Sequence, residues 1–134
     1  MLIMDKGMFT VTKKKVKWPC WPLVIFAMIF MCLECVFLFI MHFAAWIHQA
    51  VYFSIIGIPK IPFKEFLVLD RDELKKLNWF QHVGCIYCGY GNAVVAYAKA
   101  TVNMTELYSC AIKHDIAKRG QEHQKKFFEY AKFK

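Results

Sequence analysis

Residues 22–58 have the sequence PLVIFAMIFMCLECVFLFIMHFAAWIHQAVYFSIIGI, and this stretch decides the fold. Between residues 18 and 59, Glu34 is the only residue with a formal charge. A membrane-spanning helix needs about 20 consecutive apolar residues, so the stretch predicts at least one retained crossing. A cleavable signal sequence is the alternative. Its apolar core would run for only about 7–15 residues and would end at a small-residue cleavage site.

The apolar stretch is longer than one crossing requires. As one straight helix, residues 22–58 would measure roughly 55 Å, whereas the hydrocarbon core of a bilayer is about 30 Å thick. We therefore expect a crossing over residues 23–45 and an interfacial helix over residues 46–56, ended by Gly57 and Pro59. A re-entrant helix or a short membrane hairpin is the alternative.

The whole chain is short, apolar and basic. Of 134 residues 58% are hydrophobic, and 18 Lys and Arg face 10 Asp and Glu. The apolar content excludes intrinsic disorder, and the length excludes two or more large soluble domains. We divide the chain into a basic N-terminal segment, a membrane segment, a connector with a short helix, a Cys/His domain and a basic amphipathic tail: residues 1–21, 22–58, 59–81, 82–114 and 115–134.

Charge leaves the membrane orientation open. Residues 1–17 contain five Lys and one Asp, and residues 59–134 contain 13 basic and eight acidic residues. Both flanks therefore satisfy the preference for cytoplasmic Lys and Arg near a crossing. Because the cysteines suit a reducing compartment, we expect the C-terminal part of the chain to be cytoplasmic.

Four polar residues form a stripe on the apolar segment. Glu34, His42 and Gln49 fall within about one quadrant of a helix, and His48 lies near the same side. A charge at the centre of a bilayer costs roughly 2.5–3.5 kcal/mol. We therefore interpret the stripe as hydrogen-bonding to a neighbouring helix of a partner or of a second copy. A proton relay or a metal ligand set are the functional alternatives.

Four side chains in the C-terminal half have the spacing of a metal site. Cys85 and Cys88 lie three residues apart in a glycine-containing segment, interpreted as a turn. Cys110 and His114 lie four apart on one helix face, at the end of the helical pattern of residues 93–112. A Cys₃His set is typical of zinc. The sequence therefore predicts a small helical metal-knuckle domain after the membrane helix, in a mostly α-helical protein.

Several alternatives to this zinc site stay open. His82 is a competing nitrogen ligand, and iron accepts the same ligands. Cys85 and Cys88 could instead form a redox pair or a structural disulfide, the latter in an oxidising compartment. Glu106, one turn before Cys110, is interpreted as supporting a ligand rather than acting as a base.

The same region resembles a family of small, uncharacterised bacterial inner-membrane proteins. About 40 of the 134 residues are covered. Ser109 and Ala111 flank Cys110 where the family often has Trp and Pro, which loosens that turn but keeps the ligands. The resemblance implies a membrane anchor and the Cys/His set, and no reaction. It rests on Leu77-Asn78, Cys85-Ile-Tyr87-Cys88-Gly-Tyr90-Gly-Asn92, Ala96-Tyr97 and Glu106-Leu-Tyr108-Ser-Cys110-Ala-Ile112-Lys113-His114.

These patterns favour a binding role over catalysis. Residues 115–134 combine six basic and three acidic residues with aromatic side chains, which suits an anionic membrane surface. No module for nucleic-acid binding is recognisable. We expect a zinc-binding accessory, assembly or structural component of a membrane complex, with lipids and a protein partner or a second copy as its contacts. A small redox or metal-handling membrane enzyme is the alternative.

Overall fold

The computed structural model describes residues 5–6, 11–12, 21–116 and 119–134. Most of them are helical. The short strands β1 (Asp5–Lys6) and β2 (Val11–Thr12) pair antiparallel, with Asp5 opposite Thr12. The basic cluster of residues 13–17 lies outside the described residues, as does most of the N-terminal segment.

The apolar stretch forms one unbroken helical rod rather than a crossing followed by a separate helix. Helix α1 (Trp21–His48) continues through the π-helical turn η1 (Gln49–Phe53) into α2 (Ser54–Ile56). The rod ends where Gly57 adopts a φ of +79°, a left-handed conformation that favours glycine. The expected stop at Gly57 is thus confirmed. No hairpin forms within residues 22–56, since this stretch is helical throughout.

Helix α3 (Trp79–Ser109) is a second long rod and includes the segment that was expected to be a turn. It begins with a reciprocal cap: the Asn78 side chain accepts from the Gln81 amide, and the Gln81 side chain accepts from the Asn78 amide. Two of its glycines sit where another element comes close. A Cβ at Gly91 would lie 3.2 Å from Leu38, and one at Gly89 would lie 3.2 Å from the Val68 carbonyl oxygen.

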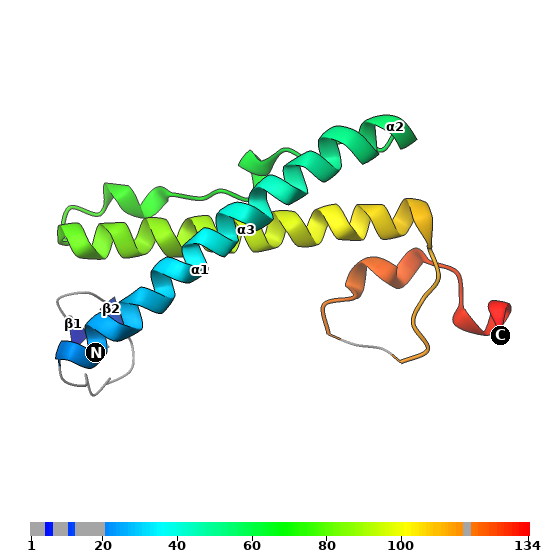
Figure 1. Cartoon of the computed structure of the whole chain (residues 1–134). Helices are drawn as coiled ribbons and strands as arrows, with labels where there is room; N and C mark the ends of the chain where they lie inside the picture. The colour runs from blue at the N-terminus through cyan, green and yellow to red at the C-terminus, as the bar shows by residue number, and fades with distance from the viewer. Residues whose placement is uncertain (1–4, 7–10, 13–20, 117–118) are drawn as a thin grey trace.

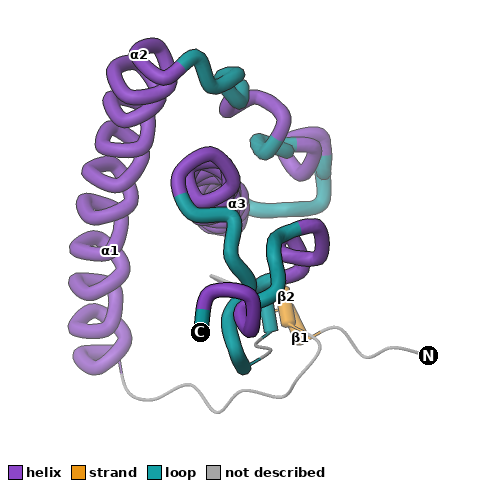
Figure 2. The backbone as a smooth tube through the Cα atoms, turned by 90° about the vertical axis from the view of Figure 1, so that its right-hand side faces the viewer, coloured by secondary structure: helices purple, strands orange, loops and turns teal. Residues whose placement is uncertain are grey.

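The rods α1 and α3 cross and run in the same direction (Figure 1). Their hydrogen-bonded partners advance together, from Glu34 with Tyr87 to Tyr52 with Ser109. The connector of residues 57–78 therefore has to return along α3 before that helix begins, as the green segment of Figure 1 shows. Viewed along α3, α1 stands on one side of it and the connector on another (Figure 2).

The connector contains two short 3₁₀ helices, η2 (Phe63–Glu65) and η3 (Asp70–Glu73). The short helix expected in the connector is thus present as 3₁₀ turns rather than as an α-helix. Pro59 and Pro62 hold the preceding chain extended. The C-terminal tail likewise forms two 3₁₀ helices, η4 (Glu122–Lys126) and η5 (Tyr130–Phe133).

The buried core is small and lies where the rods and the connector meet. Phe53 and Val94 are fully buried. Most of the apolar surface of α1 stays exposed, and Pro22–Ile56 is the one described helical stretch that is long and apolar enough to cross a membrane. The core supports the contact between the rods and leaves the outer face of α1 free for an apolar environment.

Candidate functional site

The polar stripe of α1 and η1 faces α3 of the same chain. We name this contact the helix seam. It consists of five hydrogen-bonded side-chain pairs: Glu34 with Tyr87, His42 with Tyr90, His48 with Thr105, Gln49 with Thr101, and Tyr52 with Ser109. The neighbouring helix is therefore α3 of the same chain, and not the helix of a partner or of a second copy that the sequence led us to expect. These hydrogen bonds relieve part of the cost of placing polar groups on an apolar helix.

At one end of the seam, the Tyr87 hydroxyl donates to Glu34 Oε2 over 2.9 Å. Burial, this bond and the negative charge of Glu34 together raise the pKa of Tyr87 to about 12. The Tyr90 hydroxyl lies 2.9 Å from His42 Nδ1, and burial and the neighbouring Cys35 raise its pKa. Both tyrosines therefore remain protonated at neutral pH.

His42 also sits among aromatic rings that come from three elements. Its imidazole lies 4.1 Å from the ring centroid of Phe63 on η2, and 5.8 Å from those of Tyr90 and Tyr97 on α3. Such contacts add packing energy to the hydrogen bond. His42 thus ties α1, the connector and α3 together at the crossing.

At the other end, Gln49 is 3% exposed and links three segments. Its Nε2 donates to Thr101 Oγ1 over 2.7 Å, and its Oε1 accepts from the Ile61 amide over 2.8 Å. His48 Nε2 lies 2.9 Å from Thr105 Oγ1, whose own proton goes to the Thr101 carbonyl. A hydroxyl has one proton, so His48 Nε2 must be the donor in that pair.

The structure does not bring the four expected metal ligands together. Cys85 and Cys88 lie in the first third of α3, whereas Cys110 is the residue that ends it. At 1.5 Å per residue, Cys88 and Cys110 are about 33 Å apart along the helix. His114 lies beyond Cys110, and His82 lies one turn before Cys85. Among the described residues, no group of three or more potential metal ligands forms.

Cys85 and Cys88 instead line a pocket between α3 and the connector. The pocket has a volume of about 390 Å³ and also contains Arg71, Asn92 and the apolar side chain of Leu69. Cys88 is exposed and Cys85 half-buried, and both are free thiols. We name this feature the dithiol pocket. The connector that forms the other wall of this pocket and helix α1 lie on different sides of α3 (Figure 2).

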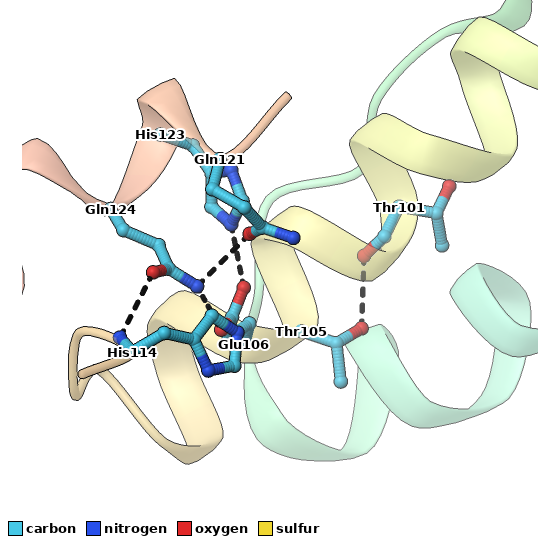
Figure 3. Close-up of polar contacts among 7 residues, drawn as sticks. All are labelled: Thr101, Thr105, Glu106, His114, Gln121, His123 and Gln124. Carbon is cyan, nitrogen blue, oxygen red and sulfur yellow. Dashed lines mark hydrogen bonds and ion pairs between the residues drawn. The ribbon is translucent and has the colours of Figure 1, made fainter. Parts of the chain in front are cut away.

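Glu106, expected to support a metal ligand, binds the C-terminal tail (Figure 3). Its carboxylate lies 2.6 Å from His123 Nε2 and accepts from Gln124 Nε2 over 2.7 Å. Gln124 Oε1 in turn accepts from the His114 amide over 3.3 Å. We name this group the tail latch.

Sequence reasoning missed the partners on α3 and in the tail. Tyr87, Tyr90, Thr101 and Thr105 follow helical spacing and could have been recognised as the polar face opposite the stripe. His123 and Gln124 carry no such signal, because they stand in a charged segment without clear periodicity.

Comparison with protein-family models, with curated proteins and with solved structures finds no match to this chain.

Proposed function

We propose that this chain is a membrane-anchored accessory protein that binds a thiophilic metal ion of the zinc type through the dithiol pocket. The observation that carries the proposal is that Cys85 and Cys88 line a solvent-reachable pocket, apart from the other cysteine and histidine of the expected set. A closed four-ligand site is inert, whereas two accessible thiols leave coordination positions for exchange.

The anchor in this proposal is α1 with η1 and α2. Its outer face is apolar, and its polar groups are hydrogen-bonded to α3 through the helix seam. A helix with internally satisfied polar groups and an apolar exterior suits a lipid environment. We place it in a bacterial inner membrane with the end of α3 and the basic C-terminal tail on the cytoplasmic side, as the preference for cytoplasmic Lys and Arg favours.

Zinc usually binds four ligands, and the dithiol pocket supplies two of them. On binding, the Cys85 and Cys88 thiols each release one proton and bind as thiolates. The remaining two positions would be filled by water or by side chains of a partner protein or second copy. This half-site connects metal binding with an accessory role, because the partner completes the coordination.

Metal analysis of the detergent-purified chain tests the proposal. We expect about one zinc ion per chain or per pair of chains after zinc loading, and its loss in Cys85→Ser and Cys88→Ser. Cys110→Ser is the matched control and should retain the metal. Metal loss in Cys110→Ser as well would indicate the Cys₃His knuckle. Absence of metal from the wild-type chain would refute metal binding. Detection of iron together with visible absorbance would identify the bound metal as iron instead of zinc.

A redox role is the second candidate, and the exposure of Cys88 beside Cys85 favours it. In that role the two thiols would become a disulfide by exchange with the disulfide of a partner protein, which takes up the two electrons and two protons. Counting the free thiols after incubation with a protein that carries a reactive disulfide distinguishes the redox role from the metal-binding role. Loss of two thiols that requires both Cys85 and Cys88 would support the redox role.

A further inference from the structure

The C-terminal tail is fixed to the end of α3. The tail latch joins Glu106 to His123 and Gln124, and Gln124 is 5% exposed. The chain after α3 also pairs with the tail: the Phe128 amide donates to the Ala111 carbonyl over 2.8 Å. Residues 119–134 are therefore held in one orientation by contacts to α3 and to the chain that follows it.

The orientation leaves an apolar and basic face outside. Phe128 and Phe133 contact each other with ring centroids 6.3 Å apart, yet they are 60% and 61% exposed. Tyr130 is 42% exposed. Lys132 and Lys134 are exposed, and their side chains make no hydrogen bond or ion pair with any residue that the structure describes. We name these five residues the aromatic–lysine face.

This face lies at the end of the helix pair where the apolar rod stops. The Tyr52 hydroxyl on η1 lies 3.0 Å from Ser109 Oγ, and Ser109 is the last residue of α3. Figure 1 shows the C-terminal segment beside this end of α3, on the side of α3 opposite to α2. The chain thus brings the aromatic–lysine face to the level at which α1 would leave a bilayer.

We propose that the aromatic–lysine face binds the anionic lipid headgroups of the membrane in which α1 is anchored. Tyr side chains, which combine an apolar ring with a polar hydroxyl, are enriched at the bilayer interface. The apolar area of exposed Phe side chains is buried there. Lysines near an anionic leaflet are attracted to it within a Debye length. The net positive charge of the tail favours anionic headgroups as the ligand, because residues 115–134 contain six basic and three acidic residues.

The inference rests on the membrane anchoring in the proposed function and is independent of the dithiol pocket. The tail latch supplies the positioning, because it holds two exposed phenylalanines beside two lysines. A mobile tail would lose conformational entropy on binding to the surface, whereas this docked one is already ordered.

Photo-crosslinking of the full chain tests the inference. Benzoylphenylalanine replaces Phe133, or Phe43 on the outer face of α1, in nanodiscs with equal amounts of anionic phosphatidylglycerol and zwitterionic phosphatidylcholine. Intact mass then identifies each adduct. We expect lipid adducts at both positions. At position 133 the ratio of anionic to zwitterionic adducts should be about three- to fivefold higher than at position 43. Lys132→Glu with Lys134→Glu should remove that preference.

Lys75→Glu with Lys76→Glu is the matched control, because both lysines are exposed in the connector. It should leave the adduct ratio at position 133 unchanged. Lipid adducts at position 43 without any at position 133 would overturn the inference but would leave the proposed membrane anchoring by α1 supported. Absence of lipid adducts at both positions would overturn both. Protein adducts at position 133 would assign the face to a second copy and would also overturn the inference.

Discussion

Replacing Gln49 by Leu removes a buried polar group that joins three segments at the helix seam. Gln49 is 3% exposed and joins η1 to α3 and to the connector, through Thr101 Oγ1 and the Ile61 amide. Leu fills a similar volume but makes neither hydrogen bond. The Ile61 amide then loses its side-chain acceptor in a half-buried position.

The expected loss in the free energy of unfolding comes from the two lost hydrogen bonds and from the Ile61 amide, which is left without its acceptor. A hydrogen bond between membrane helices contributes about 0.6 kcal/mol on average, and a typical one in a soluble protein about 0.5–1.5 kcal/mol. Leaving a buried donor unpaired costs about 1–3 kcal/mol. We therefore expect Gln49→Leu to lower the free energy of unfolding by about 2–4 kcal/mol.

Titration of the detergent-solubilised chain with a denaturing detergent, followed by circular dichroism, measures this loss. Thr101→Val, which removes only the hydroxyl, should cost less and should be non-additive with Gln49→Leu by about 0.5–1.5 kcal/mol. Ser54→Ala, at an exposed hydroxyl, is the control and should change stability by less than about 0.5 kcal/mol. A Gln49→Leu effect as small as that of Ser54→Ala, or strict additivity with Thr101→Val, would refute the helix seam.

Three further predictions follow from other contacts. Glu34→Gln should lower the pKa of Tyr87 from about 12 toward 10.0, because the carboxylate charge disfavours tyrosinate; absorbance titration beside a Tyr87→Phe reference measures this. In the native chain, the raised Tyr87 pKa contributes stability that is complete below pH 10.0 and is lost as the pH rises through about 12. Gly57→Ala should lower the free energy of unfolding by about 1 kcal/mol, because Gly57 has a φ of +79°. Gly84→Ala, in open space on α3, should instead raise it by up to about 1 kcal/mol. Thermal unfolding of the two variants measures both effects. Glu106→Ala should release the tail and speed tryptic cleavage within it by about five- to thirtyfold, as loss of 1–2 kcal/mol implies.

Each of these has a contradicting result. An unchanged Tyr87 titration in Glu34→Gln would mean that the carboxylate does not contact the hydroxyl. Equal effects of the two glycine substitutions would refute the helix end at Gly57. Unchanged cleavage of the tail in Glu106→Ala would show that the tail latch does not hold it.

The sequence was sufficient to predict the apolar rod but not its full course. Gly57 and Pro59 mark its end in the sequence, and the structure ends it there. The interfacial break expected near Trp46 does not occur, because residues 49–53 continue as a π-helical turn instead of bending. Apolar periodicity cannot distinguish these outcomes, since the sequence stays predominantly apolar across the expected break, from residue 43 to residue 58.

The segment around Cys85 shows why the candidate site could not be derived from spacing alone. Its glycines suggest a turn, since each costs a helix about 1 kcal/mol relative to Ala. In the structure, Gly91 and Gly89 allow Leu38 and the connector to approach α3, which local sequence does not reveal. Once this segment is helical, Cys110 can no longer return to Cys88.

The distance between Cys88 and Cys110 tests the central claim most directly. Spin-labelled unnatural amino acids at the neighbouring exposed positions Ile86 and Tyr108, which are also 22 residues apart on α3, leave every cysteine free to bind metal. Double electron–electron resonance in nanodiscs then measures this separation. A continuous α3 that leaves Cys85 and Cys88 as an open pair predicts a distance centred at about 33 Å. A closed knuckle would hold the two sulfur atoms on one ion with bonds of about 2.3 Å. A distance distribution confined to short values would therefore contradict the account.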